Sequence, residues 1–374
     1  MPLSRRELIA GAGAAWLGLR AGTARARPLP APPLGLRRGI DLTPNGVIRP
    51  GSLQDYRVLR AQPWAEPLIA RVTHLRLWAD WPTLEPRPGA FAGAHVAALD
   101  AQVDAAVADG LQVILMPYRY PRWANGTEDG KPAGSHGKAA PYRIAPDGHG
   151  PGSPWAGFVD ALWDRYAGRM AAFEVVNEPN LQLWPQPGSA AAVAEMMLTV
   201  DAAARRHGLS TTCLAPSHSD AETQRPFMVT EHEAFADALL AALDARGFQG
   251  GSHWVWSFHN YNDVERGENR AGALRARLTG RWRGRLAPDG GPLLYATEGG
   301  CRLESVRRRF GRELGPDAQR MAQADVLSDA LARVHTAGGV GLMTQYTVCA
   351  DPNYDCGLRE PGGAARPAFA AWVT

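Results

Sequence analysis

Short apolar runs alternate along the chain with longer segments in which apolar residues recur every three or four positions. The short runs are rich in β-branched, aliphatic and aromatic residues, which is typical of buried strands. They cover residues 36–42, 72–79, 112–118, 173–176, 210–215, 254–260, 293–297 and 340–348. Helical spacing marks residues 95–110, 189–208, 233–247 and 317–339. Strands therefore alternate with helices, which predicts a parallel sheet covered by helices.

The number of strand-like segments favours a closed barrel. Eight strands, each followed by a helix in one chain of 374 residues, fit a (β/α)₈ barrel better than an open doubly wound sheet. No Gly-x-Gly-x-x-Gly follows the first strand, which counts against a dinucleotide-binding fold. We therefore expect an α/β protein of one domain, a (β/α)₈ TIM barrel over residues 27–374. Residues 124–153, rich in glycine and proline, are expected to form a long loop over the C-terminal mouth.

The first 26 residues have the pattern of an export signal rather than of a folded segment. Arg5 and Arg6 are adjacent, an apolar run extends over residues 8–19, and Ala24-Arg25-Ala26 provides a small-x-small cleavage site. The run is well short of the roughly 20 residues needed to span a bilayer, and it lacks the polar face of an amphipathic helix. We expect a twin-arginine signal peptide over residues 1–26 and a periplasmic or extracellular protein without stable membrane insertion.

Removal of this segment also removes the apparent basicity of the chain. The formal net charge is +3, and residues 1–26 hold four arginines against one glutamate. The remaining chain is therefore near neutral, with no basic stripe of the kind that binds nucleic acid.

The four cysteines are too few for a disulfide-based scaffold. Cys349 and Cys356 bracket a short loop and could close it in an oxidising compartment. Ligand spacing typical of zinc sites is absent from the sequence, and we expect no metal.

Acidic residues end two of the predicted strands. Asn177-Glu178-Pro179 closes the fourth strand, and Glu298-Gly299-Gly300 closes the seventh. The C-terminal ends of barrel strands surround the active site, and strands four and seven face each other across it. Two carboxylates in one cleft suit glycosidic bond cleavage, because one can protonate the leaving oxygen while the other attacks or activates water.

Five segments follow the pattern of one enzyme group, in the order of that group. They are VTHLRLWADWPTLEPRPGAF at 72–91, GLQVILMPYRYPRWANG at 110–126, VVNEPN at 175–180, SFHNYND at 257–263 and YATEGG at 295–300. Together they resemble the clan-A glycoside hydrolases, and the second segment is similar to families 5 and 39. The resemblance implies a barrel enzyme that hydrolyses O-glycosyl bonds with retention of configuration and needs no cofactor.

The resemblance also implies roles for single residues. Glu178 is expected to be the general acid/base and Glu298 the nucleophile of a double displacement. Asn177 is expected to hold the sugar 2-hydroxyl group. Arg76 is expected to lie beside Glu298 and to stabilise its charged form.

Further expected contacts to the sugar come from strand six, strand eight and the loop after strand three. His259 and Tyr261 are expected to orient the nucleophile or the sugar. Members of the clan often place a tryptophan at the end of strand eight, whereas this chain has Gln345-Tyr346 there. Tyr346 is therefore the expected platform, and Trp123 is expected to stack on a sugar face, with loop packing as its alternative.

The same residues are also compatible with two other functions. A transglycosylase would use the same residues but transfer the glycosyl group to another sugar. A barrel that has lost catalysis would only bind carbohydrate, although it would then have no need for the paired acids. In each case the expected partner is an oligo- or polysaccharide bound by a monomer.

Overall fold

The computed structural model describes residues 35–42, 52–124, 148–181, 189–220, 230–311, 314–351 and 354–374, and residues 32–374 form one compact unit. The predicted signal peptide and residues 125–147 of the predicted long loop lie outside the described residues. No helix within the described ranges is both long and apolar enough to cross a membrane.

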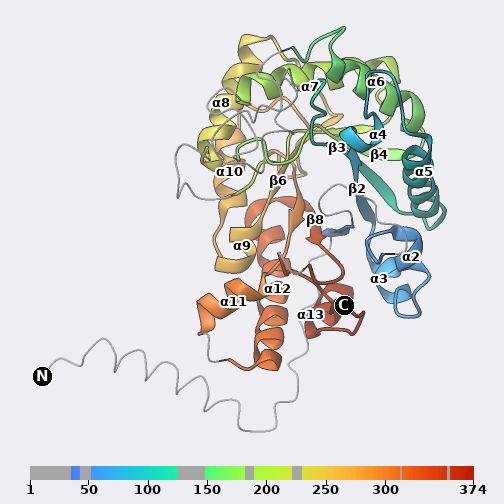
Figure 1. Cartoon of the computed structure of the whole chain (residues 1–374). Coiled ribbons are helices and arrows are strands. Elements are labelled where there is room, and N and C mark those ends of the chain that lie inside the picture. Colours follow the sequence, from blue (N-terminus) through green and yellow to red (C-terminus); the bar gives the residue numbers. More distant parts are fainter. Residues whose placement is uncertain are drawn as a thin grey trace, which may run out of the picture. The chain divides into compact units, whose positions relative to one another are not determined.

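Eight parallel strands form a closed barrel in the order of the sequence, so the predicted (β/α)₈ fold is confirmed (Figure 1). The barrel closes because β1 pairs with both β2 and β8. The strands are β1 (Arg37–Asp41), β2 (His74–Asp80), β3 (Gln112–Tyr118), β4 (Met170–Glu174), β5 (Thr212–Leu214), β6 (Trp254–His259), β7 (Leu294–Gly299) and β8 (Val340–Tyr346).

Helices surround these strands (Figure 1). The four segments with predicted helical spacing are confirmed as α5 (Gly93–Ala108), α7 (Ser189–Arg206), α8 (His232–Ala245) and α12 (Pro316–Gly338). The other described helices are α2 (Tyr56–Arg60), α3 (Glu66–Arg71), α4 (Trp81–Leu84), α6 (Pro154–Tyr166), α9 (Tyr261–Arg266), α10 (Arg270–Leu278), α11 (Leu303–Phe310) and α13 (Pro367–Val373). Helix α6 begins directly after Ser153, whose side chain accepts a hydrogen bond from the backbone N–H of Ala156 and so caps the helix.

The inside of the barrel is built in layers. One apolar layer takes a buried residue from each of six strands: Ile114, Ala172, Leu214, Val255, Tyr295 and Leu342. Residues two positions further along a strand lie on the same face of the sheet. Glu174, Ser257 and Thr297 therefore follow on the inner face, nearer to the C-terminal mouth, and form a polar layer directly beneath the predicted site.

Candidate active site

Arg76 is the centre of the polar layer, and its side chain is fully buried. Its Nε donates to Oε2 of Glu174 at 2.6 Å, and its Nη2 donates to Oδ1 of Asn177 at 2.7 Å. Its Nη1 donates to two carboxylates, Oδ2 of Asp41 at 2.6 Å and Oε2 of Glu298 at 2.9 Å. The predicted position of Arg76 beside Glu298 is therefore confirmed, and one guanidinium links β1, β2, β4 and β7.

Glu174 fixes the orientation of this guanidinium from below. Besides Arg76, its carboxylate accepts hydrogen bonds from Thr297 Oγ1 at 2.7 Å and from Ser257 Oγ at 3.3 Å. Neither Glu174 nor Asp41 was predicted as a site residue. The alternation along strand four could have identified Glu174, because it shares the inner face with Ala172.

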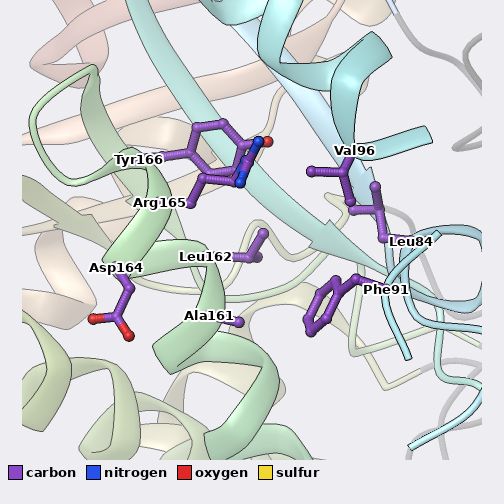
Figure 2. Close-up of a pocket in the computed structure, with 8 residues that line it drawn as sticks. All are labelled: Leu84, Phe91, Val96, Ala161, Leu162, Asp164, Arg165 and Tyr166. Carbon is purple, nitrogen blue, oxygen red and sulfur yellow. The ribbon is translucent and has the colours of Figure 1, made fainter. Parts of the chain in front are cut away.

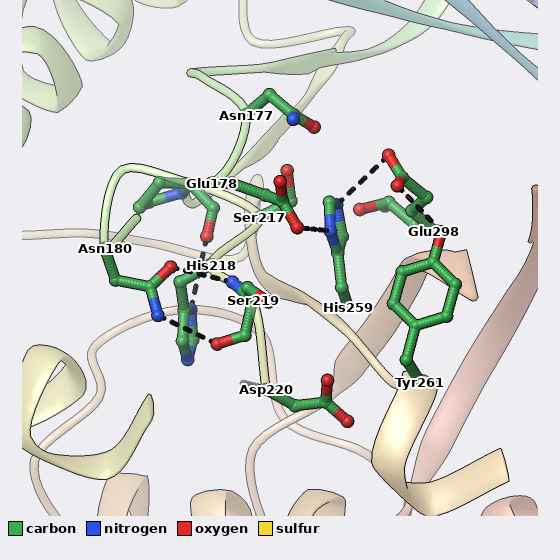
Figure 3. Close-up of polar contacts among 12 residues, drawn as sticks. Asn177, Glu178, Asn180, Ser217, His218, Ser219, Asp220, His259, Tyr261 and Glu298 are labelled. Carbon is green, nitrogen blue, oxygen red and sulfur yellow. Dashed lines mark hydrogen bonds and ion pairs between the residues drawn. The ribbon is translucent and has the colours of Figure 1, made fainter. Parts of the chain in front are cut away.

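Glu178 lies beyond the end of its strand, in an unusual backbone conformation. Strand β4 ends at Glu174, so the prediction that Asn177 and Glu178 close the strand is wrong. Asn177 instead forms an isolated bridge with Ser217, and the N–H of Glu178 donates to the carbonyl of Ser217 at 2.9 Å. The φ of Glu178 is 42°, a left-handed value that costs an L-residue about 1–2 kcal/mol. Its side chain reaches from this turn toward Glu298 (Figure 3).

Two side chains donate hydrogen bonds to the carboxyl group of Glu298. Tyr261 donates its hydroxyl to Oε1 at 2.8 Å, while Arg76 donates to Oε2 at 2.9 Å. A proton on either oxygen would compete with one of these donors, so the hydrogen bonds favour the ionised form. The glycine that follows Glu298 is required by packing, because a Cβ on Gly299 would lie 1.8 Å from Oδ1 of Asn260.

His259 lies between the two glutamates (Figure 3). Its Nδ1 is 3.0 Å from Oε1 of Glu178, and its Nε2 is 3.6 Å from Oε2 of Glu298. One oxygen of each glutamate and a ring nitrogen of His259 all lie within 4.8 Å of one another. This proximity is consistent with retaining enzymes, in which the two carboxyl groups are about 5–5.5 Å apart, and not with inverting enzymes, in which they are about 6.5–9.5 Å apart.

Burial and charge act in opposite directions on the ionisable groups of the site. Burial raises the pKa of Glu298 to about 7, against the opposing effects of His259 and Arg76. Burial lowers the pKa of His259, but the charge of Glu298 and the hydrogen bond to Glu178 outweigh it, so this pKa is raised. Glu298 and His259 therefore retain their protons to higher pH than the free side chains would.

Aromatic side chains form a wall beside the acids. Trp78, Met116, Tyr261, Tyr346 and Cys356 pack together, with Tyr118 and Tyr354 against them. The ring of Tyr354 meets those of Tyr261 and Tyr346 edge to face, at centroid distances of 5.2 and 5.6 Å. The structure thus brings the predicted Tyr346 into the site. It adds Tyr354, which the sequence analysis missed because this residue follows strand eight in a loop.

Trp123 is the predicted site residue that the described contacts do not connect to the acids. Its indole Nε1 donates to the backbone carbonyl of Glu85 at 3.1 Å, and its ring packs edge to face on Trp81 at 5.7 Å. These contacts correspond to the loop-packing alternative.

A disulfide between Cys349 and Cys356, which the sequence left open, is not formed. All four cysteines are free thiols, and Cys356 is buried in the aromatic wall. The side chain of Cys356 lies against Gly300, directly after strand β7, because a Cβ on Gly300 would lie 3.1 Å from its Cβ. It therefore acts as a small packing residue.

A separate apolar pocket of about 410 Å³ lies against helix α6 (Figure 2). Leu84, Phe91 and Val96 line one side of it, and Leu162 and Tyr166 of α6 line the other. None of its lining residues belongs to the polar layer or to the aromatic wall, so this pocket is distinct from the two glutamates.

Comparison with known proteins agrees with this geometry. Residues 70–307 match the family described as Cellulase (glycosyl hydrolase family 5), and this range includes Arg76, Glu178 and Glu298. No curated protein sequence matches the chain.

Solved structures of glycosidases share the fold at low sequence identity. A family 39 glycoside hydrolase from Bacteroides cellulosilyticus WH2 superimposes with a TM-score of 0.55 and 16% identity over 91% of this chain and 63% of that one. GH5_18 from Streptomyces cattleya in complex with GlcNAc gives 0.53 and 16%, over 91% and 79% of the two chains. A monomeric beta-xylosidase from Caulobacter crescentus CB15 gives 0.54 and 18%, over 91% and 67%. The chain therefore spans less than two thirds of the family 39 protein.

Proposed function

The chain belongs to the cellulase family, glycosyl hydrolase family 5, and on this premise we propose that it is a retaining glycoside hydrolase that cleaves an oligo- or polysaccharide. Glu178 is the general acid/base and Glu298 is the nucleophile. The observation that carries the proposal is the approach of these two carboxylates, from opposite sides of the barrel mouth, to within 4.8 Å of each other.

The reaction proceeds in two displacements. Glu298 attacks the anomeric carbon while Glu178 gives its proton to the departing glycosidic oxygen, so that the C–O bond breaks as the ester bond to Glu298 forms. Water then attacks the same carbon, its proton passes to Glu178, and the ester bond breaks. Both groups return to their starting state.

The surrounding residues prepare these groups for the reaction. Arg76 and Tyr261 hold both oxygens of Glu298, which fixes the carboxylate for attack. Arg76 also donates to Oδ1 of Asn177, and this leaves the amide nitrogen of Asn177 to donate to a sugar hydroxyl. The rings of Tyr346 and Tyr354 supply an apolar wall for the C–H faces of the sugar.

Export accompanies this function in our proposal. Polysaccharides are too large to enter a cell intact, and Arg5-Arg6 followed by an apolar run is typical of a twin-arginine signal. Replacement of both arginines by lysine should retain the protein in the cytoplasm. Secretion at the unchanged rate would contradict this part of the proposal.

The test uses Glu178→Gln and Glu298→Gln on a panel of 4-nitrophenyl glycosides and polysaccharides. Each variant should lose a factor of about 10²–10⁴ or more in kcat/KM. Glu66→Gln, on the exposed surface of α3, is the matched control and should leave turnover unchanged. Undiminished turnover in both site variants would exclude the mechanism.

Two further measurements separate the alternatives that share this site. Products formed with an excess of acceptor sugar distinguish hydrolysis from transglycosylation. Covalent labelling of Glu298 by an activated fluorosugar excludes a barrel that only binds carbohydrate.

A further inference from the structure

Asp41 and Glu298 share a single nitrogen atom. Nη1 of Arg76 donates to Oδ2 of Asp41 and to Oε2 of Glu298, both within 2.9 Å. Trp78 Nε1 is the second donor to Oδ2 of Asp41, also at 2.9 Å. The other oxygen of Asp41, Oδ1, is buried and has no hydrogen-bond partner within the described part of the chain. Asp41 is thus a fully buried carboxyl group with a single cation, which it shares with Glu298.

Carboxylates outnumber permanent cations in this layer. Asp41, Glu174 and Glu298 all bond to Arg76, whose charge can balance only one of them. The other ionisable groups that act on Glu298 or on Asp41 are Glu178, His259, Tyr118, Tyr261 and Tyr346. Of these, only His259 can supply a positive charge, and it does so only when protonated. A buried layer with this composition retains at least one proton.

We propose that Asp41 is a positioning residue that competes with Glu298 for Arg76 and thereby sets the acid side of the pH–activity profile. The proposal rests on the proposed role of Glu298 as the nucleophile. A proton on Asp41 leaves Nη1 to Glu298, which is then ionised and ready to attack. When Asp41 is ionised, it draws Nη1 toward itself and repels the charge of Glu298, so that Glu298 takes up a proton more readily.

The electrostatics of both groups support this competition. Burial raises the pKa of Asp41, although Arg76 and Trp78 partly offset the effect. The charge of Asp41 in turn contributes to the raised pKa of Glu298. Two such groups titrate as a pair, so the loss of activity toward low pH should extend over a wider range than one independent proton gives.

The experiment compares the pH dependence of kcat/KM in the wild type and in Asp41→Asn, using the 4-nitrophenyl glycoside that the wild type cleaves fastest. Asparagine keeps the shape and an acceptor oxygen but removes the charge. In Asp41→Asn, the acid limb of the profile, where kcat/KM falls toward low pH, should lie about one pH unit lower than in the wild type. It should also be steeper, with the slope expected for the titration of a single proton. Glu174→Gln removes a carboxylate that bonds to Nε instead of Nη1 and should shift the limb less.

Control experiments separate the specific effect of Asp41 from the effects of removing any negative charge and of unfolding. Asp104→Asn, on the surface of α5, removes the same charge elsewhere and should leave the profile unchanged. Circular dichroism reports folding, and Asp41→Ser replaces Asp41→Asn if the latter is unfolded. The slope of the wild-type acid limb is an independent readout that requires no variant.

Each result has a defined meaning. An acid limb that coincides in the wild type and the charge-free variant, or that moves upward, overturns the role of Asp41 while leaving the two glutamates in place. A wild-type acid limb with the slope of a single proton also overturns the role of Asp41. Full activity of Glu298→Gln would instead overturn the proposed function.

Discussion

Replacement of Arg76 by methionine should destabilise the protein, and the loss should grow with pH. Methionine fills a similar volume but leaves Asp41 and Glu174 buried without their cation, since both have fully buried side chains. Breaking a buried ion pair by removing one partner costs about 3–5 kcal/mol. For a domain of this size, such a loss lowers Tm by about 4–7 °C.

The sign of the pH dependence follows from the carboxylates that remain. Buried acids without a cation bind protons more tightly in the folded protein than in the unfolded chain, so the folded state gains stability from protonation as the pH falls. The loss of stability should therefore be greatest above pH 7 and smallest near pH 4. Arg76→Lys keeps the charge and should show a weaker pH dependence, although it cannot maintain all the bonds of the guanidinium fork.

Urea unfolding at pH 5 and at pH 8 measures this difference directly. The free energy of unfolding of Arg76→Met, relative to the wild type, should be lower at pH 8 by about 2 kcal/mol or more. An equal loss at both pH values, or a larger one at pH 5, would refute the reasoning that Arg76 chiefly compensates buried carboxylates.

Three further outcomes follow from the geometry of the site. Because the pKa of Glu298 is raised to about 7, the fraction of Glu298 that is ionised decreases below that pH. We therefore expect kcat/KM to fall as the pH drops from 7 to 5. A pH profile that is flat over this range would contradict the proposed role of Glu298. Tyr261→Phe removes the donor to Oε1 of Glu298 and should lower kcat/KM by about 10- to 100-fold, since a hydrogen bond to a charged group is worth about 1.5–3 kcal/mol. Asn180→Ala removes three hydrogen bonds of a fully buried side chain, to Thr230 and twice to Ser219; urea unfolding should show a loss of about 2–4 kcal/mol, and a loss below 1 kcal/mol would be inconsistent with these bonds.

The barrel could be predicted because its strands are buried and bounded by turns. Strand β3 has the predicted bounds, residues 112–118. Strand β4 was predicted at 173–176 but runs from Met170 to Glu174, because its partner β5 is only three residues long and the pairing ends with it. Val175 and Val176 remain buried beyond the sheet, so hydrophobicity alone could not show where the strand ends.

Short helices could not be predicted from periodicity. Helix α4 has four residues and α2 has five, and two turns or fewer cannot establish a repeat of 3.6 residues. These helices are stabilised by packing against the barrel, which the sequence does not display.

The site was predictable where a proline or a glycine follows the acid in the sequence, and hidden where apolar residues flank the acid on both sides. Glu178 and Glu298 stand next to proline and glycine, which mark the ends of strands. Asp41 and Glu174 lie within apolar runs, and only the barrel register brings both of them to Arg76. Tyr354 joins the site through a loop contact, which no sequence spacing encodes.

The exposure of the two glutamates distinguishes their proposed roles. An acid/base must release its proton and recover it from water in each cycle, whereas a nucleophile benefits from the exclusion of water, which would weaken its interactions. The side chain of Glu178 is 21% exposed and that of Glu298 is 8% exposed. The left-handed backbone of Glu178 brings its carboxylate to the rim of the mouth, where water can reach it. Glu298 stays within the strand, where Arg76 and Tyr261 replace the water that its carboxylate loses. If the two roles were exchanged, Glu298 would have to exchange protons with water at a site where water is scarce. Glu178 would then be the nucleophile at a site where water competes for its oxygens.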